Sequence, residues 1–192
     1  MSTHDDLRDI ALNEFAVAGY AGTSLQRIAE IAGLSKSSVL YHFDSKEALL
    51  EAAIGPAIDR MDAILGSIGG SLQDDDTRRA FIEQFVDFLL AHRLEVHMFI
   101  NQGPGLEDVP VIDRANALVV TLSTYFSSAV STVEDNLRFG IALGGAAYVL
   151  SAPGGEANHK GSLGSLPVDE VRAALITIVS ELLAPISVRS TK

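Results

Sequence analysis

The stretch Thr23–Phe43 reads T-S-L-Q-R-I-A-E-I-A-G-L-S-K-S-S-V-L-Y-H-F and predicts two short helices joined by a turn. Its first apolar residues recur with the spacing of one buried helical face, at Leu25, Ile28, Ala29 and Ala32. Gly33 then stands where a helix end favours a left-handed backbone, and Ser35 offers its hydroxyl as the N-cap of a second helix. Two short helices around a glycine-containing turn form the helix-turn-helix pattern.

The second helix has two chemically different faces, as a rotation of about 100° per residue shows. The inward face is predicted to hold Val39, Leu40 and Phe43, and the outward face Ser37, Ser38, Tyr41 and His42. Lys36 lies in the first turn. Hydroxyls, an imidazole and an ammonium group are suited to contact base edges or phosphates, and small serines allow close approach to a major groove. The alternative is an ordinary solvent-exposed helix, whose outer face is also polar.

The segment before this pair predicts a covering helix. Its apolar positions Leu7, Ile10, Ala11, Phe15 and Ala18 lie on one helical face, and Gly19 ends it. Thr23 and Gln26 have the spacing of a capping box, which predicts that Thr23 begins the next helix. Such a role is compatible with a DNA contact by the same residue.

Composition sets limits on the class of protein. The chain has 192 residues, 47% of them hydrophobic, and no cysteine. It contains no apolar run near the length of a membrane span, so we expect a soluble protein without a membrane partner. Its polar, acidic beginning lacks the layout of a secretion signal. The absence of cysteine fits the reducing cytoplasm.

The net charge of −11 argues against DNA binding when taken over the whole chain. Only the window from Thr23 to Lys46 is positive, because Arg27, Lys36 and Lys46 outnumber Glu30 and Asp44. We therefore expect weak non-specific affinity, and specific binding that depends on two subunits acting together.

The remaining chain is predicted to be helical. A long fourth helix runs from about Leu50 to Ile68, with a kink or break at Gly55-Pro56. Further helices are expected over residues 77–93, 94–102, from Pro110, over 134–150 and from Pro167, with loops at 66–76 and up to Ser165. Gly140, Gly144 and Gly145 predict the close approach of another backbone. A terminal seam of Val171, Leu175, Ile178 and Leu182 predicts a helical partner, either in a second copy or in the same chain.

The central helices also offer candidates for a small-molecule site. These residues are apolar, aromatic or polar-tipped: Met61, Phe85, Phe88, His92, Phe99, Asn101, Tyr125 and Phe126. An aromatic stripe of this kind also occurs in an ordinary core. His92 and His97 are five residues apart and do not share the face that a helical metal pair uses, so we expect no metal. No nucleophile elbow or glycine-rich nucleotide motif is present, and we expect neither catalytic residues nor a cofactor.

The run from Gly22 to Leu50 resembles the DNA-binding signature of the TetR family of transcriptional regulators. The matching positions are Thr23, Ser24, Ile28, Ala29, Ala32, Gly33, Ser35, Tyr41, His42, Phe43, Ser45, Lys46, Glu47 and Leu49. The resemblance implies that bases face Gln26, Lys36, Ser37, Ser38 and His42, and that phosphates contact Thr23, Tyr41 and Lys46. It departs at Leu40, where many members carry an aromatic residue, and Tyr41 is positioned to replace that contact.

The resemblance covers about a quarter of the chain and implies an all-α protein in two parts. Residues 1–48 would form a three-helix DNA-binding domain, and residues 49–192 a helical effector-binding and dimerisation domain in which the last two helices pair with their symmetry mates. The function implied is repression from a palindromic operator by a cytoplasmic homodimer that a small-molecule effector releases. Activation, a helical module that has lost DNA reading, and an enzyme are the alternatives.

Overall fold

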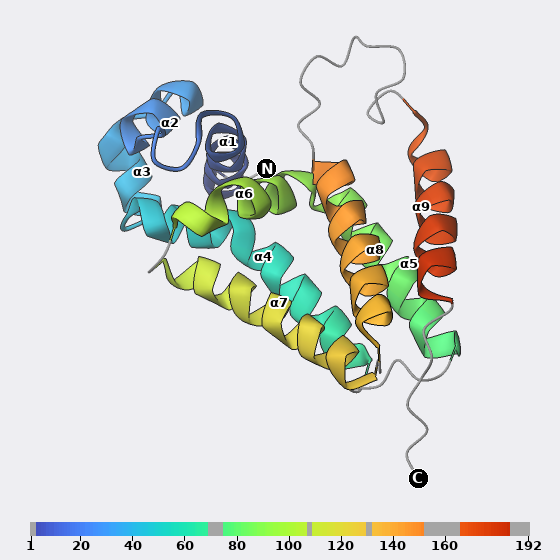
Figure 1. Cartoon of the computed structure of the whole chain (residues 1–192). Coiled ribbons are helices and arrows are strands. Elements are labelled where there is room, and N and C mark those ends of the chain that lie inside the picture. The colour runs from blue at the N-terminus through green and yellow to red at the C-terminus, as the bar shows by residue number, and fades with distance from the viewer. Residues whose placement is uncertain (1–2, 69–74, 107–108, 130–131, 152–165, 185–192) are drawn as a thin grey trace. The chain divides into compact units, whose positions relative to one another are not determined.

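The computed structural model describes residues 3–68, 75–106, 109–129, 132–151 and 166–184, and in residues 126–129 it describes the backbone only. Every regular element in these ranges is helical (Figure 1), which confirms the all-α prediction. The α-helices are α1 (Thr3–Ala18), α2 (Leu25–Ala32), α3 (Lys36–His42), α4 (Lys46–Ser67), α5 (Asp75–Ala91), α6 (Arg93–Gln102), α7 (Pro110–Ala129), α8 (Val133–Ser151) and α9 (Val168–Leu183). A short 3₁₀ turn, Gly103–Gly105, follows α6.

The chain forms two compact units, each built from two segments. The first contains residues 1–59 and 94–116, and the second contains residues 60–93 and 117–192. The boundaries of these compact units differ from the predicted boundary between two functional domains at residue 48. The division into functional domains stays a prediction. The expected loop at 66–76 is only partly described, because α4 continues to Ser67 and residues 69–74 lie outside the described ranges.

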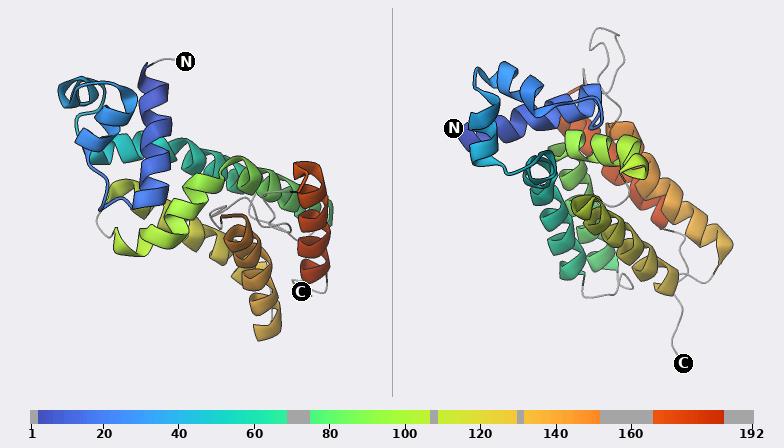
Figure 2. Two further views of the ribbon diagram at one scale, coloured as in Figure 1. Left: turned by 90° about the horizontal axis from the view of Figure 1, so that it is seen from above. Right: turned by 90° about the vertical axis from the view of Figure 1, so that its left-hand side faces the viewer.

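In the first unit, α1, α2 and α3 pack together around one apolar core (Figures 1 and 2). Its buried side chains include Leu7, Ala11, Phe15, Ile28, Ala29, Val39 and Phe43, and Leu49 and Leu50 at the start of α4 are buried as well. Gly19 and Gly33 have φ angles of +83° and +67°, the left-handed backbone at which glycine is favoured. Both predicted helix ends are confirmed.

The turn between α1 and α2 is held by Thr23 and not by a capping box. The Thr23 side chain is buried, at 3% exposure, and its hydroxyl donates to the carbonyls of Gly19 and Glu14 at 2.8 and 3.2 Å. Ser24 is the N-cap of α2, and its hydroxyl accepts from the Arg27 amide at 3.1 Å. The prediction that Thr23 begins the helix was wrong by one residue, because Ser24 carries the same capping chemistry.

Helix α4 continues through Pro56, so the predicted break does not occur. The residue before it is Gly55, and the absence of a Cβ there removes part of the clash with the proline ring that normally disfavours helix. Arg114 of α7 forms ion pairs with α4 on both sides of Pro56. Its guanidinium pairs with Glu51 at 2.5 Å and also with Asp59, and all three residues belong to the first unit.

The second unit is built on α5, α8 and α9, which pack against one another (Figures 1 and 2). The predicted starts of α7 and α9 near residues 110 and 167 are confirmed, whereas α5 begins at Asp75, two residues before its predicted start at residue 77. The Arg172 guanidinium of α9 binds the Asp87 carboxylate of α5 through two bonds of 2.5 and 2.9 Å. These bonds lower the pKa of Asp87.

The buried line of α9 differs from the predicted seam. Val171, Val179 and Leu183 are buried, whereas Ile178 is exposed. Leu175 and Leu182 are half-buried. At about 100° per residue, the buried side chains Val179 and Leu183 lie about 80° and about 120° to one side of Val171 around the helix. Ile178 lies about 20° to the other side and so falls at the edge of the buried stripe.

One face of α8 is open in the single chain. A Cβ atom added at Gly140, Gly144 or Gly145 would meet no atom within 4 Å, so the close approach predicted for these glycines does not occur within the described chain. Five large apolar side chains on the same helix are exposed, namely Val133, Leu137, Ile141, Tyr148 and Val149. The first four follow one another at spacings of four, four and seven residues, which places them on one helical face.

Among the described residues, none of the helices combines the length and the apolar character that a membrane crossing requires.

Candidate nucleic-acid interface

Helix α3 is anchored by one face and exposed on the other. Val39 and Phe43 are buried at i and i+4, whereas Tyr41 between them is 86% exposed. At the N-terminus the Ser35 hydroxyl accepts from the Ser38 amide at 3.1 Å, which is the predicted N-cap. This arrangement holds a short helix firmly and leaves its outer surface free for contact.

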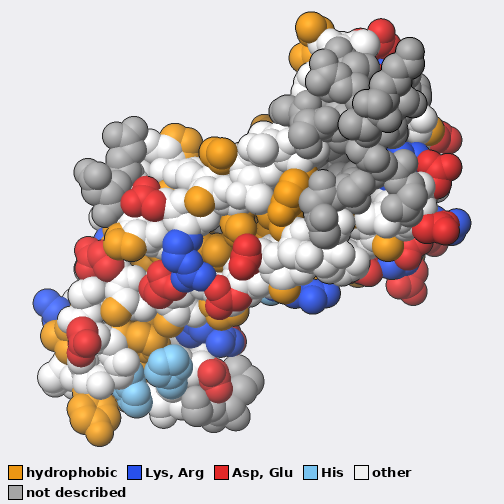
Figure 3. Space-filling view, turned by 90° about the horizontal axis from the view of Figure 1, so that it is seen from below, with side chains coloured by type: hydrophobic (Ala, Val, Ile, Leu, Met, Phe, Trp, Pro, Cys, Tyr) orange, Lys and Arg blue, Asp and Glu red, His pale blue; other side chains and the backbone are white. Residues whose placement is uncertain are grey.

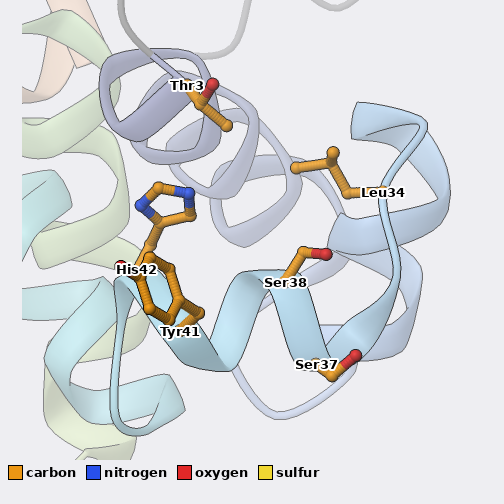
Figure 4. Close-up of a pocket in the computed structure, with 6 residues that line it drawn as sticks. All are labelled: Thr3, Leu34, Ser37, Ser38, Tyr41 and His42. Carbon is orange, nitrogen blue, oxygen red and sulfur yellow. The ribbon is translucent and has the colours of Figure 1, made fainter.

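A shallow hollow lies beside α3 (Figure 4). Its lining residues come from α1, from the turn before α3 and from α3 itself: Thr3, Leu34, Ser37, Ser38, Tyr41 and His42. The Ser35 hydroxyl lies 2.8 Å from those of both Ser37 and Ser38, so the three hydroxyls form one hydrogen-bonded cluster. Hydroxyls can donate and accept by rotating, so this surface can adapt to either kind of base edge.

The structure corrects the predicted position of Leu40, which is 39% exposed and not directed inward. In a seven-residue helix the buried stripe is narrow, and Val39 with Phe43 already fills it. Leu40 therefore adds an apolar group near the polar face. Apolar groups of this kind can contact the methyl group of thymine.

The predicted residues of α2 are less available. Gln26 is exposed, but its amide donates to the Glu30 carboxylate at 3.0 Å. Thr23 is buried, with its hydroxyl bound to two carbonyls of the α1 end, so the structure gives it a role in the turn and no surface for a phosphate. Arg27 is paired with Glu14 at 3.3 Å.

Two lysines provide the cations of this surface. Lys36 is exposed in the first turn of α3. Lys46 begins α4, and its Nζ lies 4.1 Å from the centroid of the Tyr20 ring. Burial lowers the pKa of the Lys46 ammonium, and the neighbouring Glu47 carboxylate works against that shift. A phosphate near this ammonium would favour its charged form in the same way as Glu47.

Tyr20, Thr3 and His4 also lie in this region, although the sequence did not predict a role for them there. Tyr20 is buried and its ring packs 5.2 Å from that of Phe15. The pKa of Tyr20 is raised to about 12, mainly by burial and to a smaller extent by the Glu47 carboxylate. His4 of α1 lies 4.4 Å from the Phe43 ring and 6.4 Å from the His42 ring. The one sequence signal for a role of Tyr20 was its position, as an aromatic residue directly after Gly19 at the end of a helix.

Charge on the visible surface is mixed. Figure 3 shows one face, on which basic side chains lie singly or beside acidic ones and form no continuous basic field. Together with the net charge of −11, this leaves few cations for phosphate neutralisation.

The predicted effector residues divide between the two units. Phe99 is half-buried and Asn101 is exposed in the first unit, where the Asn101 amide donates to the His97 carbonyl at 2.9 Å. In the second unit Phe85 and Phe88 are buried, with stacked Phe81 and Phe85 rings 5.7 Å apart and the Phe88 and His92 rings 5.0 Å apart. Met61 and Tyr125 are half-buried there, and the side chain of Phe126 lies outside the described residues.

Comparison with protein-family models matches residues 7–53 to the family described as bacterial regulatory proteins, tetR family. A curated relative is the HTH-type transcriptional regulator RutR of Escherichia coli strain K12, which is 49% identical over 123 residues, 57% of this chain and 56% of RutR. Another is the biofilm operon icaADBC HTH-type negative transcriptional regulator IcaR of Staphylococcus aureus strain Newman, 36% identical over 61 residues, 32% of this chain and 33% of IcaR. The chain thus matches little more than half the length of the first relative.

Solved structures share the fold over nearly the whole chain. The ketosteroid transcriptional regulator KstR2 of Mycobacterium tuberculosis superimposes with a TM-score of 0.72 at 18% identity, over 97% of this chain and 95% of that one. A TetR-family transcriptional regulator from Bordetella parapertussis 12822 gives 0.65 at 20% identity, over 93% and 94%. At these identities the likeness concerns the fold alone.

Proposed function

Because the chain belongs to the TetR family of bacterial regulatory proteins, we propose that it is a DNA-binding transcriptional repressor that a small-molecule effector releases from its operator. The observation that carries this proposal is the outward polar face of α3, with Ser37 and Tyr41 exposed while Val39 and Phe43 anchor the helix. Such a helix fits the major groove, where side chains from its outer face reach base edges.

The residues proposed for base contact on α3 are Lys36, Ser37, Ser38 and His42. Tyr41 of α3 and Lys46 at the start of α4 are proposed to hold phosphates. Gln26 is also proposed to contact a base, after DNA displaces its hydrogen bond to Glu30. Thr23 is left out, because its hydroxyl is buried and already bonded.

The proposed active form is a homodimer that joins through α8 and α9. Ile141 of α8 is 63% exposed, and the glycines beside it leave open space into which a second copy of the helix fits. A twofold dimer presents two copies of α3, and a palindromic operator matches that symmetry. The dimer also doubles the number of cations that face the DNA, which this acidic chain needs.

Regulation is proposed to follow from differential affinity. An effector that binds one conformation better shifts the population toward it, and release occurs when that conformation presents the two α3 helices at the wrong spacing. Phe88, His92 and Tyr125 of the second unit and Phe99 and Asn101 of the first remain proposed contacts. So do the other three candidates, Met61, Phe85 and Phe126.

The name of IcaR, a negative transcriptional regulator, supports repression over activation. The relatives are named as regulators and not as enzymes. Binding to chromosomal DNA implies a cytoplasmic protein. The acidic charge favours one other function, a helical ligand-binding module that no longer reads DNA.

Selection of bound fragments from random duplex DNA at low salt tests the proposal. The wild-type chain is expected to recover a palindrome. Tyr41→Ala and Lys36→Ala are expected to weaken binding to that duplex at least tenfold each, whereas Arg79→Ala, which removes an exposed cation from α5 of the second unit, is expected to change it less than twofold. If no fragment is enriched at low salt, the module without DNA reading is the correct function.

A further inference from the structure

The last residue of α6 binds the end of α1 through its side chain. The Gln102 Oε1 atom accepts from the Tyr20 backbone amide at 2.6 Å, and its Nε2 atom donates to the Phe15 carbonyl at 2.6 Å. All three residues belong to the first unit. Tyr20 is buried, and a buried backbone amide needs a hydrogen-bond partner. Gln102 thus supplies a partner that the turn after Gly19 needs at this point.

Tyr20 in turn holds Lys46. The Lys46 Nζ atom lies 4.1 Å from the centroid of the Tyr20 ring, within the range of a cation–π interaction. The same ring packs 5.2 Å from the Phe15 ring, so both residues that contact Gln102 also contact each other. A lysine carries its charge on a flexible four-carbon stem, and a fixed aromatic ring limits where that charge can lie.

We propose that Gln102 is a positioning residue for the DNA-phosphate contact of Lys46, and that it acts through the backbone and ring of Tyr20. This rests on the proposed function, because Lys46 contacts a phosphate only in a DNA-binding protein. Gln102 itself touches no DNA in this arrangement. A displacement of the α6 end would release the Tyr20 amide and free Lys46, so the bond pair connects the position of α6 to a DNA contact.

The salt dependence of DNA affinity tests the proposal, since it counts the phosphates that a protein neutralises. The logarithm of the association constant falls with the logarithm of salt concentration by about 0.9 per phosphate contact. With two subunits on the selected duplex, Lys46→Ala is therefore expected to reduce that slope by about 1.8. Gln102→Met, which keeps the length of the side chain and removes both hydrogen bonds, is expected to reduce it by at least half as much.

Three further variants separate positioning from a general loss of structure. Tyr20→Phe keeps the ring and is expected to retain the wild-type slope, whereas Tyr20→Leu is expected to match Lys46→Ala. Gln84→Met on α5 is the matched control, since its amide donates to the carbonyl of Ala80 in its own helix. In the Lys46→Ala background, Gln102→Met is expected to change the slope no further, because residues that act through one contact are not additive.

The outcomes distinguish the proposal from the function on which it rests. If the wild type selects no duplex, the proposed function fails. If the wild type binds but Lys46→Ala keeps its slope, or if Lys46→Ala reduces the slope and Gln102→Met does not, the positioning role is refuted and the DNA-binding function stands. Should Gln102→Met fail to fold by circular dichroism, the comparison of Tyr20→Leu with Tyr20→Phe decides: equal slopes overturn the proposal.

Discussion

Replacing Gly22 by alanine should disrupt the turn that sets α2 against α1. A Cβ atom at this position would lie 2.5 Å from the Ala18 carbonyl oxygen, 3.6 Å from the Ala18 carbonyl carbon and 3.9 Å from the Gly19 oxygen. All three are backbone atoms of the same turn, so no side chain can rotate to relieve the clash. The backbone between Ala18 and Thr23 must move, and the bonds from the Thr23 amide and hydroxyl to Gly19 weaken with it.

The expected cost follows from two opposing terms. Forcing an extra methyl into filled space costs about 1–3 kcal/mol. Alanine also restricts the unfolded chain and returns up to about 1 kcal/mol. The free energy of unfolding should therefore fall by about 1–2 kcal/mol. With an m-value of about 2 kcal/mol/M, the urea midpoint moves down by about 0.5–1 M.

Urea unfolding followed by far-UV circular dichroism, at one fixed protein concentration, measures this shift. Gly66→Ala is the matched control, because a Cβ atom there meets nothing within 4 Å and the residue lies in α4. It should leave the midpoint unchanged or raise stability by up to about 1 kcal/mol. A Gly22→Ala variant that unfolds at or above the wild-type midpoint would show that the turn tolerates a Cβ and that the clash does not govern its stability.

Three other changes have defined outcomes. Arg114→Met removes the pairs with Glu51 and Asp59 and, because these are surface pairs, should lower the free energy of unfolding by only about 1 kcal/mol, with a smaller loss in 1 M NaCl. Ile141→Glu places a charge on the open face of α8 and should convert the proposed dimer to a monomer in sedimentation velocity. Ionisation of Tyr20, followed as the change in absorbance at 295 nm that is lost in Tyr20→Phe, should have its midpoint near pH 12. Between about pH 10 and 12 only the unfolded chain loses the phenol proton of Tyr20, so the free energy of unfolding should fall as pH rises through this range.

The helix ends could be predicted because single glycine and proline residues mark them in the local sequence. Gly19 and Gly33 adopt positive φ, and proline at 110 and 167 stands at a helix start, as each residue type favours in any protein. The errors came where two local rules competed. Ser24 displaced Thr23 as a cap, and Gly55 relieved the clash that Pro56 would otherwise produce.

Distant contacts could not be predicted from one sequence. Gln102 is separated from Phe15 and Tyr20 by 87 and 82 residues, and nothing in its neighbourhood distinguishes it from any other helix-terminal glutamine. The outward face of α3 was predictable in part, because rotation along a helix is regular, yet Leu40 was misplaced. Burial at the edge of a stripe depends on how the neighbouring helix packs, which periodicity does not specify.

The contacts of Gln102 and Tyr20 that are proposed to position Lys46 matter because few cations lie near α3. A protein with a broad basic surface tolerates a lysine that is slightly misplaced, because its neighbours supply charge. Here the chain is acidic overall and Arg27 is paired with Glu14, so the proposed DNA binding would rest largely on Lys36 and Lys46. When few phosphates are neutralised, each one carries a large share of the affinity. The side chains that fix Lys46 should therefore influence DNA binding almost as strongly as Lys46 itself.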